Sequence, residues 1–101
     1  MDDIHERIET LKAEAARTRV DHLQTALDTV KVYANLAETE QQLGDLDGAR
    51  KALQRAEHSL ASARGFLSNP KHQMSGEVRQ ELSRRADSLR SRLDDLKRSL
   101  G

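Results

Sequence analysis

Residues 41–50 read QQLGDLDGAR, and this stretch separates two long segments that both have a helical pattern. Neither Gly nor Pro occurs from residue 3 to residue 43, so Gly44 is the first residue that favours the end of a helix. Glycine tolerates the left-handed conformation in which many helices end, and Asp45 or Asp47 can cap the helix that follows. The stretch therefore predicts a turn between two helices.

Apolar residues recur at spacings of three and four on both sides of this turn, which is the pattern of a helix with one apolar side. Before the turn they form two stripes, Ile4, Ile8, Leu11 and Ala15, and then Ala16, Val20, Leu23, Leu27, Val30, Ala34 and Ala37. The second stripe is shifted by one residue, which we interpret as a slip that keeps a long helix in register with its neighbours. Later stripes are Ala49, Leu53, Ala56, Leu60, Ala63 and Leu67, and Leu82, Ala86, Leu89, Leu93, Leu96 and Leu100.

Asn69-Pro70 marks a second break, because the residue before a proline is disfavoured in a helix. We therefore expect helices at about 3–43, 46–68 and 76–100 within a single helical domain, 1–101. Short connections favour antiparallel neighbours, so the predicted fold is an all-α, up-down-up three-helix bundle with a long first helix. The regular spacing of the last stripe predicts coiled-coil-like packing.

The expected helices differ in length, and this difference predicts an exposed surface. Forty residues of helix are about 60 Å long, whereas the second and third helices, with roughly 23 residues each, are about 35 Å long. They can cover only the C-terminal part of the first helix, which leaves Ile4, Ile8, Leu11 and Ala15 bare. An uncovered apolar stripe usually marks a contact surface, so we predict that these four residues bind a second copy or a partner helix. The alternative is a break near Thr18-Arg19 that folds the first helix back.

Composition and charge set broad limits on function. The apolar residues are mostly Leu and Ala, which favours helix over sheet. Lys plus Arg and Asp plus Glu each number 17, and this zero net charge does not favour a dedicated nucleic-acid binder. Residues 1–14 hold five acidic and two basic side chains, and residues 79–98 hold four acidic and seven basic ones. Such segments can attract each other across a dimer, although they are also typical of solvated helix faces.

The expected location is the cytoplasm. The chain has no cysteine, and its acidic start lacks the basic and apolar regions of a signal peptide. No apolar run approaches the roughly 18 residues of a membrane span, so we expect no membrane segment.

Seven positions between residues 30 and 63 follow the spacing of a known helical hairpin: Tyr33, Leu36, Ala37, Gly44, Ala49, Leu53 and Ala56. This stretch resembles a single tetratricopeptide repeat (TPR), a helix-turn-helix of about 34 residues. Glu40 departs from the family where an aromatic residue is usual, and Ala61 where a proline is common. Pro70 interrupts the next frame of the same length, so we find no second copy. The resemblance implies a hairpin that the third helix closes, without the concave groove of a repeat array.

The residue types that commonly carry catalysis form no recognisable motif. His5, His22, His58 and His72 make none of the His-x-x-x-His or Glu-x-x-His pairs that place two metal ligands on one helix face. Neither a glycine-rich phosphate loop nor a nucleophile motif is present. We therefore expect no catalytic, cofactor-binding or metal-binding residues, no small-molecule substrate and no enzyme activity.

One enzyme family provides an alternative. Residues 4–11 and 47–50 look similar to the small all-helical chorismate mutases, which implies a cationic site made by Arg17 or Arg19 with Lys31 and Arg50. Lys51 stands where that family has Glu, and the final helix lacks a matching Gln, which puts the resemblance in doubt.

Nucleic-acid binding by the Arg-rich third helix is another alternative. Its arginines are interleaved with acids, and no aromatic residue lies nearby for base stacking. We expect instead a protein–protein interaction or scaffold module that forms a homodimer through the N-terminal half of its first helix.

Overall fold

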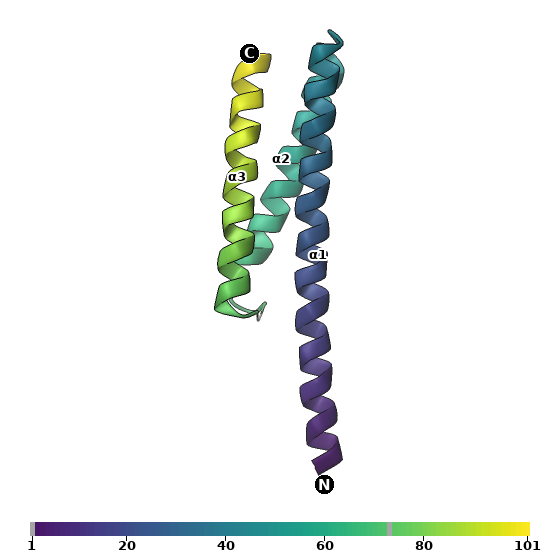
Figure 1. The fold of residues 1–101 in the computed structure, drawn as a ribbon, viewed down its shortest axis with the longest axis vertical. Helices are drawn as coiled ribbons and strands as arrows, with labels where there is room; N and C mark the ends of the chain where they lie inside the picture. Colours follow the sequence, from purple (N-terminus) through teal and green to yellow (C-terminus); the bar gives the residue numbers. More distant parts are fainter. Residues whose placement is uncertain (1, 73) are drawn as a thin grey trace.

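A computed structural model describes residues 2–72 and 74–101, and within them it confirms the predicted all-α, three-helix bundle (Figure 1). Helix α1 spans Asp2–Gln42, α2 spans Leu46–Ser68 and α3 spans Gly76–Leu100. α2 returns along the C-terminal half of α1, and α3 then runs in the direction of α1 again. The order is therefore up-down-up, and the N-terminal end of α1 extends well beyond the other two helices.

The turn between α1 and α2 is built around Gly44, whose φ of 83° lies in the left-handed region. The Gly44 amide donates to the Gln41 carbonyl at 3.1 Å, and the Asp45 amide donates to the Glu40 carbonyl at 2.8 Å. These two bonds form a Schellman motif, which satisfies carbonyls that the end of a helix would otherwise leave free. Asp45 then caps α2, because its carboxylate accepts a bond from the Gly48 amide at 2.9 Å.

The connection from α2 to α3 is held by both helices. Arg79, in the first turn of α3, donates to the backbone carbonyls of Leu67 and His72. The ring of His72 also stacks on Phe66, with the ring centroids 3.7 Å apart. Ser75 caps α3 by accepting a 3.2 Å bond from a backbone amide in the first turn. These contacts fix the direction in which α3 leaves the connection.

The core between the helices is entirely aliphatic, and among the described residues no polar or charged side chain is buried. Small side chains are concentrated near the turn, where Ala34 and Ala37 of α1 face Ala49, Ala52 and Ala56 of α2. They allow the two helices to approach closely. Leucines make up most of the buried face of α3, in agreement with its regular spacing: Leu82, Leu89, Leu93, Leu96 and Leu100, together with Ala86.

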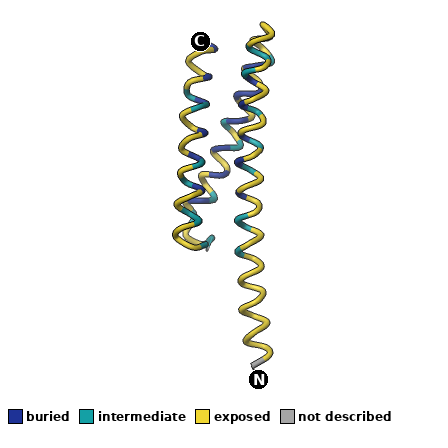
Figure 2. The backbone as a smooth tube through the Cα atoms, viewed as in Figure 1, coloured by how far each residue is buried: buried dark blue, intermediate teal, exposed yellow. Residues whose placement is uncertain are grey.

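Helix α1 is continuous through Thr18-Arg19, so the chain does not break and fold back there. The first buried residue of α1 is Leu23, and Ala16 is the first that is half-buried. Residues 3–15, which we call the arm, form a bare helix outside the bundle, whereas residues 16–101, which we call the body, contain the whole core (Figure 2). The molecule consequently measures 66 × 18 × 16 Å.

Candidate interaction surface

The arm carries the four residues that the sequence indicates as a contact surface. The side chains of Ile4, Ile8 and Leu11 are 67%, 44% and 64% exposed, and Ala15 is exposed as well. Spacings of four, three and four residues place them on one side of a helix. The structure therefore brings the four together as one exposed apolar stripe, which we call the stripe. At its C-terminal end, Ala15 lines a groove with Lys71 of the α2–α3 connection.

The same side of α1 remains free of charge beyond the arm. Val32, Leu36 and Leu43 continue the spacing of the stripe, and their side chains are 62%, 42% and 76% exposed. All twelve positions of the pattern lack Asp, Glu, Lys and Arg: Ile4, Ile8, Leu11, Ala15, Thr18, His22, Thr25, Thr29, Val32, Leu36, Thr39 and Leu43. We call this set the outer seam. Sequence reasoning recognised only its first four members, because threonines and a histidine interrupt the apolar signal.

The outer seam and the buried stripe of α1 lie on different sides of the helix. Each residue turns an α-helix by about 100°, so the seam, offset by two residues from the buried stripe, lies about 160° away from it. Leu23 and Leu27 of the buried stripe are 1% and 0% exposed. The interpretation of the one-residue shift as a slip within one face is therefore wrong. The shift separates a face that is buried in the bundle from a more exposed face, whose middle members His22, Thr25 and Thr29 line a groove with α2.

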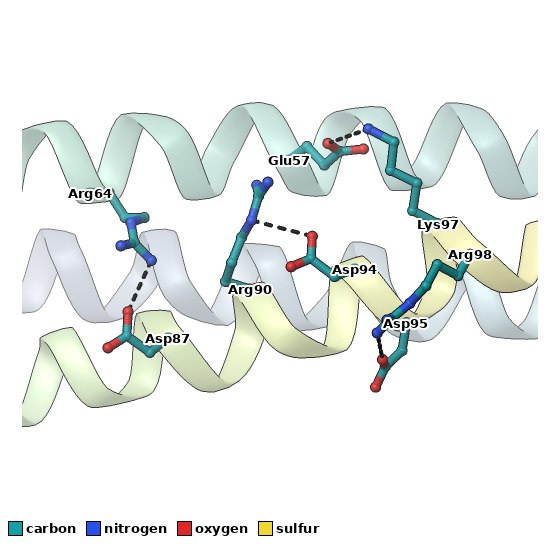
Figure 3. A network of polar contacts seen from close by, with 8 residues as sticks. All are labelled: Glu57, Arg64, Asp87, Arg90, Asp94, Asp95, Lys97 and Arg98. Carbon is teal, nitrogen blue, oxygen red and sulfur yellow. Dashed lines mark hydrogen bonds and ion pairs between the residues drawn. The ribbon is translucent and has the colours of Figure 1, made fainter.

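Ion pairs tie α3 to α2 along one side of the body. Arg64 pairs with Asp87 at 3.0 Å, and Lys97 pairs with Glu57 at 3.8 Å (Figure 3). Arg50 adds a 3.3 Å hydrogen bond to a backbone carbonyl at the end of α3. These side chains remain partly exposed, so each pair contributes little stability, and the aliphatic core shared by the three helices holds them together.

A second set of ion pairs ties α3 to α1. Arg85 pairs with Asp28, and Arg92 contacts both the Glu38 carboxylate at 3.1 Å and the Asn35 carboxamide at 2.7 Å. Every basic side chain of α3 contacts a carboxylate or a backbone carbonyl of the described residues: Arg79, Arg84, Arg85, Arg90, Arg92, Lys97 and Arg98. This pairing does not favour α3 as a surface for nucleic acid, which needs cations free to contact phosphates.

The charged side chains of the arm differ from those of the body. All ion pairs between described side chains lie within residues 28–98. Asp3, Arg7, Glu14 and Arg17 are exposed and take part in none of these pairs. The arm thus combines exposed apolar residues with charges that form no ion pair with a described side chain.

The positions of the TPR-like pattern lie in the α1–α2 hairpin. Ala37, Ala49 and Ala56 are fully buried where the two helices approach each other, and Gly44 forms the turn. Tyr33 is half-buried beneath the guanidinium group of Arg55, which lies 5.9 Å from the ring centroid. Leu36, by contrast, is exposed in the outer seam. α3 packs against both helices of the hairpin.

The described side chains form no cluster that could bind a metal ion. Among the described residues, no three His, Cys, Asp or Glu side chains are close enough to hold a metal ion.

At the α1–α2 turn, a hydrogen bond with Asp45, partial desolvation and the charge of Asp45 raise the pKa of Glu40. In the part of the chain that the structure describes, no helix has the combined length and apolar character needed to cross a membrane.

The cations of the enzyme alternative are spread along the molecule. Arg19 and Lys31 are separated by twelve residues of continuous helix, or about 18 Å. Arg50 is engaged with the C-terminal end of α3. One chain therefore does not bring these residues into a cluster around a dianionic substrate.

No protein-family model, curated protein or solved structure matches this chain.

Proposed function

We propose that this protein is a protein–protein interaction module that binds through the stripe of its arm, in the first place to a second copy of itself. The observation that carries the proposal is the exposure of Ile4, Ile8 and Leu11 on a helix that the core does not cover. Burial of apolar surface contributes about 25 cal/mol per Å², so covering these side chains favours association. The TPR-like hairpin closed by α3 would then serve as the compact scaffold that carries the arm.

The shape of the surface supports a helical partner. Ile4, Ile8 and Leu11 of the stripe lie exposed on the surface of a single helix. Its spacing of three and four residues is the one by which two helices interlock their side chains. A second helix with the same spacing is therefore the simplest surface that could cover it, and the arm of another copy provides one.

The test is the solution mass, measured by light scattering across a range of concentrations. We expect the mass to rise from that of the 11.4 kDa monomer to that of a dimer as the concentration increases. The Ile8→Asp variant should remain monomeric, because pairing would bury an unpaired carboxylate, whereas its circular dichroism should be nearly unchanged.

A matched control separates the stripe from the helix itself. Ala13 is exposed on the side of the arm opposite to the stripe, so Ala13→Asp introduces the same charge with a comparable effect on helix propensity. We expect this variant to form the dimer. A protein that stays monomeric at every concentration, or a dimer that survives Ile8→Asp, would contradict the proposal.

A further inference from the structure

We infer that the arm binds the arm of a second copy in antiparallel orientation, with Ile4 opposite Ala15 and Ile8 opposite Leu11 of the partner copy. This inference rests on the proposed self-association and adds its orientation and register. In this arrangement each large side chain of the stripe meets an apolar residue of the partner. Two-fold symmetry repeats both kinds of pair, so the interface has four apolar layers.

The free length of the arm fits this register. The overlap ends at Ala15, and Ala16 is the first half-buried residue of α1. At the end of the overlap, Lys71 from the α2–α3 connection lines a groove with Lys12, Ala15, Ala16 and Arg19. The acidic N-terminal end of the partner arm would lie beside this basic groove. A pairing of the two arms thus uses the part of α1 that the body leaves bare.

The charges along one edge of the stripe specify the antiparallel orientation. The edge consists of the residues one position before each stripe residue, continued by one turn: Asp3, Arg7, Thr10, Glu14 and Arg17. Its charges read negative, positive, neutral, negative and positive. Read backwards, the same series has the opposite sign at every charged position. When two copies of this edge meet in antiparallel orientation, Arg7 faces Glu14 beside the stripe, and this pair occurs twice. Asp3 and Arg17 lie at one level along the axis, farther from the stripe.

The four edge charges are Asp3, Arg7, Glu14 and Arg17, and Asp3 and Arg7 are spaced so that they can also attract each other within one arm. They are exposed, and none takes part in an ion pair with a described side chain. On the other flank of the stripe, antiparallel pairing brings His5 beside Lys12 of the partner copy, and this contact contains no carboxylate. The edge from residue 3 to residue 17 is consequently the one that determines orientation.

A parallel dimer would pair the charges less well. In a parallel coiled coil in register, the residue that precedes Ile8 or Ala15 faces the partner residue five positions later in the sequence. Arg7 would then face Lys12, a repulsive pair, and Glu14 would face Arg19, an attractive pair. The two contributions nearly cancel, so charge gives the parallel orientation no net preference.

A longer antiparallel overlap is also disfavoured. Pairing the whole outer seam, with Ile4 opposite Leu43, would place Asp21 opposite Asp28. This contact is like-charged and occurs twice. Asp28 is in addition already paired with Arg85 of α3. Charge therefore restricts the overlap to the arm.

Disulfide trapping tests the register, and the absence of native cysteine in the chain makes the result unambiguous. The variants Ile4→Cys and Ala15→Cys are oxidised separately and as an equimolar mixture. In the inferred register residue 4 lies beside residue 15 of the partner copy, whereas the two copies of residue 4 are about 16 Å apart along the axis, too far for a disulfide. We expect cross-linked dimer only in the mixture. A cross-link in either variant alone would overturn the antiparallel register.

Charge reversal tests the edge independently. Arg7→Glu or Glu14→Arg converts two attractive pairs into two repulsive ones, and we expect the dissociation constant to rise about tenfold at low salt. The double variant Arg7→Glu/Glu14→Arg should return to the original affinity, and the two single variants, when mixed, should form a heterodimer. Glu6→Arg is the matched control for Glu14→Arg, because it makes the same change of charge on the side of the arm away from the stripe. We expect it to leave the dissociation constant unchanged.

The outcomes separate this inference from the proposed function. In a parallel dimer, the carboxylate introduced by Arg7→Glu would face Lys12 of the partner copy and strengthen the association. A tighter dimer would therefore overturn the inference, while the proposed function stands. A dimer that responds to neither single variant also overturns it. If the wild-type protein is monomeric in light scattering at every concentration, the proposed self-association is contradicted, and the inference that rests on it is contradicted as well.

Discussion

The two halves of α1 have the same spacing of apolar residues and opposite exposure. Leu27 is 0% exposed, whereas Leu11, on the same continuous helix, is 64% exposed. The residue types do not explain this difference. α2 and α3 have 23 and 25 residues against the 41 of α1, so they end before they reach the arm. A periodic pattern thus predicts that a helix has an apolar side, and the lengths of the neighbouring helices decide which part of that side is buried within the chain.

Amide hydrogen exchange should show the largest difference between the two halves. The amides of the arm lie in a helix end without tertiary contacts and open by local fraying, whereas those near Leu27 open only when the bundle unfolds. For a bundle with a free energy of unfolding of about 5 kcal/mol, the protection should differ by more than about a thousandfold. The measurement is residue-resolved exchange by NMR in dilute protein. Equal protection along the whole of α1 would show that the arm is not separate from the body.

The same substitution in each half provides the next test. Leu27→Ala removes a fully buried side chain and should lower the free energy of unfolding by about 2–5 kcal/mol. Leu11→Ala should change it by less than about 0.5 kcal/mol, because the side chain is exposed in the monomer. Urea denaturation at a concentration where the protein is monomeric measures both values. If Leu11→Ala were as costly as Leu27→Ala, the arm would have to pack against the body.

A pair of glycine substitutions tests the turn that limits α2 to the second half of α1. Gly44→Ala forces a side chain into a left-handed conformation and should cost about 1 kcal/mol. Gly65→Ala lies within α2 with no other atom within 4 Å of the added carbon, so it should stabilise by about 0.5–1 kcal/mol. Thermal unfolding should therefore shift in opposite directions. A shift of the same sign for both would contradict the assigned role of Gly44.

The smallest expected effect concerns pH and is confined to the body. Because the pKa of Glu40 is raised in the folded state, ionisation of Glu40 favours the unfolded state, and this contribution appears as the pH rises above the ordinary pKa of a glutamate. Glu40→Gln should therefore stabilise the protein slightly at neutral pH, and the difference should vanish in acid. Urea denaturation of both proteins at several pH values checks this. A difference that grows in acid would have the wrong sign.

The fold class could be predicted because the decisive residues have few alternatives. Gly44 and Asn69-Pro70 interrupt otherwise unbroken helical patterns, and the leucines of the last segment have a single consistent spacing. The absence of Gly and Pro favours a continuous α1, but the sequence alone could not rule out the alternative break, because Thr18-Arg19 neither demands nor forbids helix. In the structure the Thr18 hydroxyl donates to the Glu14 carbonyl at 2.9 Å, which a helix accommodates.

The candidate surface was only partly readable from the sequence. The exposure of Ile4, Ile8 and Leu11 followed from helix lengths, whereas their role in binding stays a prediction. The sequence pattern did not indicate that the uncharged side continues to Leu43, because threonines dominate its middle. The continuation to Leu43 could have been recognised from an absence, because no Asp, Glu, Lys or Arg occurs at any position of the outer seam. The complementary edge from Asp3 to Arg17 becomes visible only once the stripe defines which residues flank it.

The elongated outline of the molecule affects how its size will be measured. At 66 × 18 × 16 Å, the chain is more than three times longer than it is wide, because the arm adds length with little volume. A rod of this kind has a larger hydrodynamic radius than a sphere of the same mass, so it leaves a gel-filtration column early. Elution volume alone would therefore make the monomer resemble a dimer, and the frictional ratio of the Ile8→Asp variant becomes the reference against which true association is recognised.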